Sequence, residues 1–303
     1  MRVGVIGRSQ LLLSSIDAVL EGGHSLSFIQ TTRAEDYYEA GVEDFAARAR
    51  ALDVPFFSGG NLGRNLVPLA GGTDVAISVN WPTLIGSEVR ASFRHGVLNA
   101  HAGDLPRYRG NACPNWAILN FERQASVTIY RMTDELDSGP WLAKAHLPID
   151  EETYIGEIYA WLETAVPSLF AEALDRIEGR GFIAEDPAVR PFRTFPRRPE
   201  DGRIAWNGST RQILALIRAS SRPFAGAFSD LEGDERVTIF RARRFEPDFG
   251  FSAVPGQVCL RNGDNPVVAT SDGKNENEDC RTSSAEGGAA KAIVARSLRA
   301  RFF

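Results

Sequence analysis

One stretch combines an apolar run with a polar loop: GVLNAHAGDLPRYRGNACPNW, Gly96–Trp116. Asn99 and His101 stand where the apolar run ends, so their side chains share one face if the run is a strand. Ligands of α/β sheets bind at such strand ends, where an amide and an imidazole can stabilise an oxyanion or move a proton. An Asn or a His beside a loop also commonly bonds local backbone, so a structural role stays open at this point.

Apolar runs before and after this stretch alternate with helical patterns. Strands are predicted at residues 2–7, 25–30, 74–79, 97–99 and 127–131. Helical patterns follow the first strand through residue 20 and fall within residues 37–52. The alternation predicts an α/β fold, a Rossmann-like doubly wound sheet with mostly parallel pairing and right-handed crossovers.

In the second half of the chain, the sequence pattern predicts a long helix followed by a smaller module. Apolar residues recur at helical spacing over 155–177, and Pro167 is expected to kink or interrupt that helix. A Pro- and Arg-rich linker begins at residue 184. A short helix is predicted at 210–219. Predicted strands at 237–241 and 257–260 indicate a β-rich module. We expect three parts: a catalytic domain (1–183), a linker and small C-terminal domain (184–272), and a disordered or atypical tail (273–303).

Composition narrows the class of protein. The 303 residues carry a net charge of −5, which disfavours a broad nucleic-acid-binding face. The three cysteines lack metal-ligand spacing and suit a reducing cytoplasm, so we expect no metal. The sequence shows neither a signal peptide nor a membrane-spanning run. Dinucleotide and ATP fingerprints are also absent. We expect a cytoplasmic protein without membrane or nucleic-acid partners.

Three motifs occur together in the expected order: Leu-Pro-Arg-Tyr-Arg-Gly at 105–110, Asn-Trp-Ala-Ile at 115–118 and Glu-Leu-Asp-Ser-Gly at 135–139. With them the chain resembles the folate-dependent formyltransferases, which include methionyl-tRNA formyltransferase and the sugar N-formyltransferases. The Arg-Pro-Phe-Ala-Gly-Ala-Phe run at 222–228 resembles the segment that opens the C-terminal part of that family. The resemblance implies the formyltransferase fold.

The resemblance also assigns catalytic roles to Asn99, His101 and Asp137. It implies 10-formyltetrahydrofolate as the formyl donor and a primary amine as the acceptor. Asn99 and protonated His101 would then donate to the oxyanion of the tetrahedral intermediate. Asp137 would either keep His101 charged or take the proton of the amine, and both roles stay open. Taken alone, Asp137 in Asp-Ser-Gly is also a good turn residue.

The folate site that the resemblance implies is lined by Asn80 and Trp81 after one strand, and by Asp134 and Leu136 in the loop before Asp137. Trp81 is equally compatible with a core aromatic that caps the sheet.

Four residues are candidates for substrate binding: Arg8, Ser9, Arg109 and Asn111. Arg8 and Ser9 open a predicted helix, whose N-terminus attracts anions, although ordinary capping by Ser9 fits as well. Arg109 either contacts a phosphate or braces its own loop.

The runs at 80–81 and 115–118 resemble the sugar branch of the family. We therefore expect the acceptor to be a nucleotide-linked amino sugar, GDP-perosamine or a dTDP-aminodideoxyhexose, used for O-antigen in lipopolysaccharide biosynthesis, and the enzyme to be a homodimer. Three alternatives stay open: a UDP-linked 4-amino-arabinose as the acceptor, a methionyl-tRNA formyltransferase, and a non-catalytic folate- or nucleotide-binding protein on the same fold. The nucleotide and the sugar are not specified by these residues.

Overall fold

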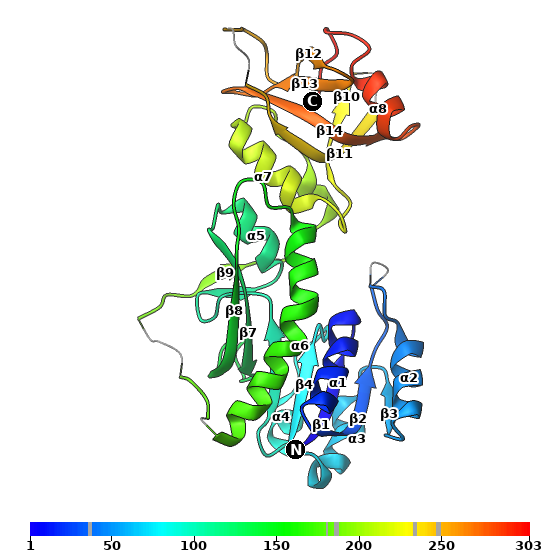
Figure 1. The fold of residues 1–303 in the computed structure, drawn as a ribbon, viewed down its shortest axis with the longest axis vertical. Helices are drawn as coiled ribbons and strands as arrows, with labels where there is room; N and C mark the ends of the chain where they lie inside the picture. Colours follow the sequence, from blue (N-terminus) through cyan, green and yellow to red (C-terminus); the bar gives the residue numbers. More distant parts are fainter. Residues whose placement is uncertain (36–37, 180, 185–187, 233–234, 247–249) are drawn as a thin grey trace. The chain divides into compact units, whose positions relative to one another are not determined.

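The computed structural model describes residues 1–35, 38–179, 181–184, 188–232, 235–246 and 250–303. They form two compact units (Figure 1). The first unit comprises Met1–Cys113, Ala125–Leu147 and Tyr159–Phe195, and the second comprises Pro114–Gln124, Pro148–Ile158 and Pro196–Phe303. The units therefore divide after residue 195 and not after 183, and the second unit takes two short segments from within the predicted catalytic domain.

A seven-stranded sheet forms the centre of the first unit. Its strands are β1 (Arg2–Gly7), β2 (Ser25–Thr31), β3 (Phe56–Ser58), β4 (Val75–Val79), β5 (Val97–His101), β7 (Gln124–Arg131) and β8 (Trp141–Pro148), in the order β3-β2-β1-β4-β5-β7-β8. The pairs from β3 through β5 are parallel, whereas β7 lies antiparallel to β5. The predicted mostly parallel α/β sheet is thus confirmed, and the antiparallel join occurs at the strand that carries the candidate site.

Helices cover both faces of this sheet. They are α1 (Gln10–Glu21), α2 (Val42–Ala51), α3 (Leu62–Leu66), the 3-10 helix η1 (Val67–Gly72), α4 (Ser87–Ser92) and α6 (Ile155–Gly179). Val3 and Val5 of β1 join a core cluster with apolar residues of α1, α2 and α6, while Ile6 joins a second cluster with α3 and α4. This alternation is the period-two pattern of a strand buried on both faces. Part of the predicted 37–52 helix, Tyr37, lies outside the described residues.

Of the two outcomes expected at Pro167, a kink or an interruption of the long helix, the interruption does not occur. α6 runs continuously from Ile155 to Gly179 with Pro167 inside it. Proline removes one helical hydrogen bond, but Val166 and Phe170 on either side of it are buried in the core. Tertiary packing therefore outweighs the local cost. No helix in the described part of the chain is both long enough and apolar enough to cross a bilayer.

The second unit contains a five-stranded antiparallel sheet. Its strands, in spatial order, are β10 (Ala227–Leu231), β11 (Glu235–Arg244), β14 (Lys274–Thr282), β13 (Asn265–Ala269) and β12 (Val258–Asn262). The helices are α5 (Cys113–Leu119), η2 (Pro199–Gly202), α7 (Thr210–Ser220) and α8 (Gly287–Val294), of which α5 begins in the first unit. Phe302, next to the last residue, stacks on Trp206 in the core of this unit with ring centroids 5.1 Å apart.

The expectation that residues 273–303 are disordered is wrong. They form β14, the central strand of the second sheet, and then α8. β14 escaped sequence analysis because its side chains are polar, yet those of residues 274–277 are each at most 1% exposed.

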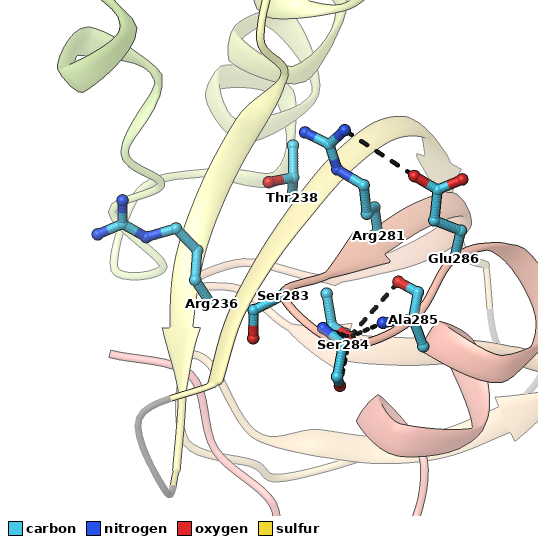
Figure 2. Close-up of a pocket in the computed structure, with 8 residues that line it drawn as sticks. Arg236, Thr238, Arg281, Ser283, Ser284, Ala285 and Glu286 are labelled. Carbon is cyan, nitrogen blue, oxygen red and sulfur yellow. Dashed lines mark hydrogen bonds and ion pairs between the residues drawn. The ribbon is translucent and has the colours of Figure 1, made fainter.

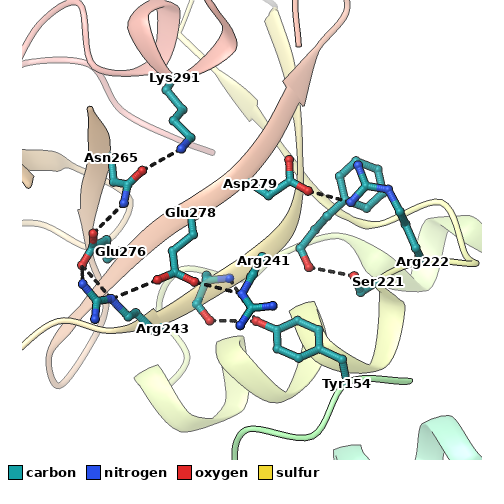
Figure 3. A network of polar contacts seen from close by, with 12 residues as sticks. Tyr154, Ser221, Arg222, Arg241, Arg243, Asn265, Glu276, Glu278, Asp279 and Lys291 are labelled. Atoms are coloured by element: carbon teal, nitrogen blue, oxygen red, sulfur yellow. Dashed lines mark hydrogen bonds and ion pairs between the residues drawn. The ribbon is translucent and has the colours of Figure 1, made fainter. Parts of the chain in front are cut away.

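Hydrogen bonds and an ion pair with side chains of other strands stabilise this buried polar strand. Glu276 accepts a hydrogen bond from Asn265 Nδ2 at 2.7 Å and pairs with Arg243 at 3.0 Å (Figure 3). It also accepts from Asn262 Nδ2 at 3.1 Å. Lys291 of α8 extends the network by donating to Asn265 Oδ1 at 2.8 Å. A buried carboxylate is stable only when its oxygens are paired in this way.

The two short strands β6 (Tyr108–Gly110) and β9 (Phe192–Thr194) form a parallel pair in the first unit. Their pairing fixes the loop that follows β5, and so it determines which groups surround His101.

Candidate functional site

The strand β5 ends at the candidate site. Asn99 is partly buried and His101 is 8% exposed. Val97, two residues before Asn99, lies in the core cluster under α3 and α4, so Asn99 and His101 lie on that same face of the sheet. The strand therefore places both side chains on one face, as their spacing in the sequence predicted.

Asp137 is held by two donors from different parts of the first unit. The backbone N–H of Gly110 donates to Oδ2 at 2.7 Å, and the Tyr130 hydroxyl donates to Oδ1 at 3.0 Å. Asp137 is 7% exposed and has a φ of 47°, a left-handed conformation that Asp tolerates better than most residues. Gly110 itself has a φ of 109°, and a Cβ there would lie 2.0 Å from the Thr194 carbonyl oxygen, so only glycine fits.

His101 is surrounded by groups that favour its charged form. Nδ1 lies 3.7 Å from Asp137 Oδ2, Nε2 donates to the Tyr108 carbonyl oxygen at 2.8 Å, and Cys113 Sγ lies 3.6 Å from Nε2. Burial lowers the pKa of His101, but the hydrogen bond with Cys113, the charge of Asp137 and the Tyr108 carbonyl outweigh it and raise the pKa to about 9. His101 is therefore an imidazolium at neutral pH.

Sequence analysis missed Tyr130, which lies directly opposite Asn99 across β5 and β7. Tyr130 is 2% exposed and connects Asn99 to Asp137. Burial raises the pKa of its hydroxyl, and the nearby charge of Asp137 raises it further. A predicted strand at 127–131 was the only sequence signal, because the partner of Tyr130 depends on the antiparallel register.

Cys113 was noted in the sequence only as one of three cysteines without metal-ligand spacing. Its buried Sγ lies near His101 and 3.2 Å from Thr194 Oγ1 of β9. The distance in sequence between residues 113 and 194 explains why no local pattern revealed this contact.

The residues predicted to bind folate lie at several loops of the first unit. Asn80 has a φ of 54° and donates from Nδ2 to Ser9 Oγ at 3.2 Å. Trp81 packs against the core cluster under α3 and α4. This contact agrees with the alternative interpretation of Trp81 as a core aromatic. Asp134 forms an ion pair with Arg90, and Leu136 is 36% exposed. A folate-binding role for these residues stays a prediction.

The residues predicted to bind substrate make hydrogen bonds or ion pairs within the first unit. Arg8 donates to the Asn80 carbonyl oxygen at 2.9 Å and pairs with Glu35 at 2.9 Å. Ser9 is the N-cap residue of α1, and its side chain makes no capping hydrogen bond. Arg109 Nε donates to the Pro106 carbonyl oxygen at 3.2 Å, which braces the loop. Asn111 is exposed, and its backbone N–H bonds the Thr194 carbonyl oxygen. Substrate contacts by these four residues likewise stay a prediction.

A pocket of about 680 Å³ lies in the second unit (Figure 2). It is lined by Arg236 and Thr238 of β11 and by residues 281–286. Both of its arginines face carboxylates, since Arg236 pairs with Asp230 at 3.2 Å and Arg281 lies 3.9 Å from Glu286. None of the predicted site residues lines it. In the described part of the chain, no group of three or more His, Cys, Asp or Glu side chains is placed to hold a metal ion.

The chain is similar to several known proteins. It is 31% identical over 201 residues to a methionyl-tRNA formyltransferase of Thermodesulfovibrio yellowstonii, an alignment that covers 66% of this chain and 63% of that protein. It thus spans less than two thirds of that relative's length.

Two solved structures share the fold. The N-formyltransferase from Helicobacter canadensis, in complex with folinic acid and dTDP-3-aminofucose, matches with a TM-score of 0.68 and 15% identity over 91% of this chain and 98% of that chain. HypX from Aquifex aeolicus, in complex with tetrahydrofolic acid, matches with a TM-score of 0.63 and 22% identity over 93% of this chain and 44% of that chain.

Two family models match successive parts of the chain. The formyl transferase model matches residues 67–174, a range that contains Asn99, His101 and Asp137. The model of the formyl transferase C-terminal domain matches residues 197–282, within the second unit. Residues 67–174 and 197–282 are therefore assigned to the formyl transferase family.

Proposed function

We propose that this protein transfers the formyl group of 10-formyltetrahydrofolate to the primary amine of a nucleotide-linked amino sugar. The observation that carries the proposal is the arrangement of a buried imidazolium at His101, the amide of Asn99 beside it on β5, and the carboxylate of Asp137 3.7 Å from the ring.

These residues suit the steps of formyl transfer. The amine attacks the formyl carbon, and the carbonyl oxygen gains negative charge in the tetrahedral intermediate. The Asn99 amide and the Nδ1–H of the His101 imidazolium supply N–H donors for that oxyanion, since the Nε2–H already donates to the Tyr108 carbonyl oxygen. Each donor contributes about 3–4 kcal/mol to the barrier reduction. The intermediate then collapses by breaking the bond between the formyl carbon and N10 of the folate, which takes up a proton and leaves as tetrahydrofolate.

The ionisation of His101 bears on which group takes the proton of the amine. With a pKa of about 9, His101 already carries its proton at neutral pH and is not available as a base. Asp137 is the remaining group of the trio that can accept a proton. Asp137 therefore serves as the base in the proposed mechanism, and it also keeps His101 charged.

Two observations support a small acceptor over tRNA. The second unit is rich in arginine, but many of these side chains are paired with carboxylates of the same unit. The ion pairs are Arg203–Asp230, Arg222–Asp279, Arg236–Asp230, Arg241–Glu278, Arg243–Glu276 and Arg281–Glu286. Arginines already opposed by carboxylates release few counterions from a nucleic acid, and so they add little affinity for its phosphates. The fold match to a sugar-nucleotide-bound N-formyltransferase also extends over 98% of that protein.

A methionyl-tRNA formyltransferase is the second candidate. The 31% identical relative favours it, and residues 196–303 carry 17 Lys and Arg against 14 Asp and Glu. The ordered second sheet also removes one reason for preferring a sugar, namely the expected disorder of residues 273–303.

The test is the mass of the product. The protein is incubated with 10-formyltetrahydrofolate and GDP-perosamine, dTDP-aminodideoxyhexoses, UDP-4-amino-arabinose or initiator methionyl-tRNA, with His101→Asn as the control. The gain of one CO unit on one sugar nucleotide, lost in the variant, supports the proposal. Formylation of methionyl-tRNA alone moves the protein to the second candidate. Folate binding without any transfer supports a non-catalytic binding protein.

A further inference from the structure

The pairing of β5 with β7 puts the Tyr130 hydroxyl between two of the catalytic candidates. Asn99 and Tyr130 face each other across the antiparallel strands. The hydroxyl donates to Asp137 Oδ1 at 3.0 Å and also hydrogen-bonds the Asn99 side chain. Because Tyr130 is 2% exposed, solvent has little access to replace either contact.

The direction of these hydrogen bonds follows from counting protons. A phenol has one proton, and an ionised carboxylate only accepts. The Tyr130 proton therefore goes to Asp137, and the phenol oxygen accepts from the Asn99 amide. This turns the nitrogen of the amide toward Tyr130 and leaves the second N–H of Asn99 for a ligand.

We propose that Tyr130 is a positioning residue of this site, which fixes the orientation of the Asn99 amide and holds the Asp137 carboxylate beside His101. The kinetic consequences rest on the proposed function, whereas the placement of Asp137 does not. A shift of about 1 Å in a catalytic group can cost about 100-fold in rate, so a buried hydroxyl that positions two groups is expected to affect turnover strongly.

The first experiment needs no activity. Tyr130→Phe removes the hydroxyl, and Tyr154→Phe is the matched control, because the Tyr154 hydroxyl also makes two hydrogen bonds, to the Ala242 carbonyl oxygen at 3.0 Å and from the Ala242 N–H at 3.2 Å. NMR titration then measures the pKa of His101 in each protein.

In Tyr130→Phe we expect the pKa of His101 to fall by about 0.5–1 unit as the carboxylate of Asp137 loosens, while Cys113 and the Tyr108 carbonyl still face the ring. Tyr154→Phe leaves it unchanged. An unchanged His101 pKa in Tyr130→Phe overturns the proposal, even if the wild-type protein transfers no formyl group.

The second experiment uses turnover. Tyr130→Phe is expected to lower kcat by about 10- to 100-fold with KM for folate and acceptor changed less than about threefold. In an Asp137→Asn background it should lower kcat by a smaller factor than in the wild type, because the contact with Asp137 is already altered and only the contact with Asn99 is left to lose. A normal kcat, a change in KM alone, or fully multiplicative losses contradict the positioning role. Absence of transfer by the wild-type protein contradicts the proposed function instead.

If Tyr130→Phe does not fold, the hydroxyl can be tested through its two partners. Asn99→Ala and Asp137→Asn, singly and together, then report their coupling in the free energy of unfolding. Coupling through Tyr130 predicts that the double variant loses less stability than the sum of the single variants. Strict additivity overturns the proposal.

Discussion

Replacing Asp137 with Asn should lower the pKa of His101. The substitution removes the carboxylate whose Oδ2 lies 3.7 Å from Nδ1 of the ring. The amide keeps the shape of the side chain and still accepts from the Gly110 N–H, so the loop around it is expected to stay folded. Burial, which lowers the pKa of His101, then meets less opposition, because only Cys113 and the Tyr108 carbonyl continue to raise it.

The size and sign of the effect on stability follow from linkage. Raising the pKa of His101 from 6.5 to about 9 corresponds to about 3 kcal/mol, at about 1.4 kcal/mol per unit. The folded state holds the proton more tightly than the unfolded state. This stabilisation is therefore complete below about pH 6.5 and is lost as the pH rises through about 9. In Asp137→Asn the loss should be smaller and should be complete at a lower pH, because the folded-state pKa of His101 is lower.

The assay is an NMR titration of the four histidines, with the His101 signal assigned from the His101→Gln spectrum. Denaturant unfolding between pH 6 and 9.5 then compares wild type, Asp137→Asn and His101→Gln. The difference in free energy of unfolding between the wild type and His101→Gln should decline by about 3 kcal/mol across that range. A wild-type His101 that titrates near pH 6.5, or one whose titration Asp137→Asn does not move, refutes the reasoning.

Three further changes test other contacts of the chain. Gly110→Ala places a side chain at φ 109° and should abolish turnover while lowering the melting temperature, measured by scanning calorimetry. Cys113→Ala should lower the pKa of His101 in the same NMR titration, because the thiol hydrogen bond raises that pKa. Asn275 Oδ1 and Asn277 Nδ2 are buried without a hydrogen-bond partner among the described residues. Replacing both by Val should raise the free energy of unfolding by about 1–3 kcal/mol in denaturant titrations, and destabilisation would contradict this.

The candidate catalytic trio could be identified in the sequence because its signals are local, and its catalytic role stays a prediction. Asn99 and His101 have the spacing of one strand face, and Asp137 lies in a motif of five consecutive residues. The resemblance to formyltransferases then supplied roles that spacing alone left open. Tyr130 carried no such signal. Its importance depends on an antiparallel register between β5 and β7, whereas alternating strands and helices predict parallel neighbours.

The strand β14 shows a different limit of sequence reasoning. Hydrophobic periodicity identifies strands by the apolar residues that they bury, and β14 buries Lys274 and Glu276 instead. Glu276 is neutralised by Arg243, which lies 33 residues earlier on β11. Compensation of a buried charge by a distant residue leaves no local pattern, so the segment reads as a disordered tail.

The roles of two glycines of the site were likewise not apparent from the sequence. Gly110 and Gly139 both have positive φ, and a Cβ at Gly139 would lie 2.2 Å from the Arg131 carbonyl oxygen. The sequence indicates that the chain turns at each glycine, but not which backbone approaches it. In the structure the approach at Gly110 aims its N–H at Asp137, and the approach at Gly139 closes the loop that carries Asp137. The position of the carboxylate beside His101 is therefore determined by two close backbone contacts, which is why substitution at either glycine should affect catalysis as strongly as substitution of Asp137 itself.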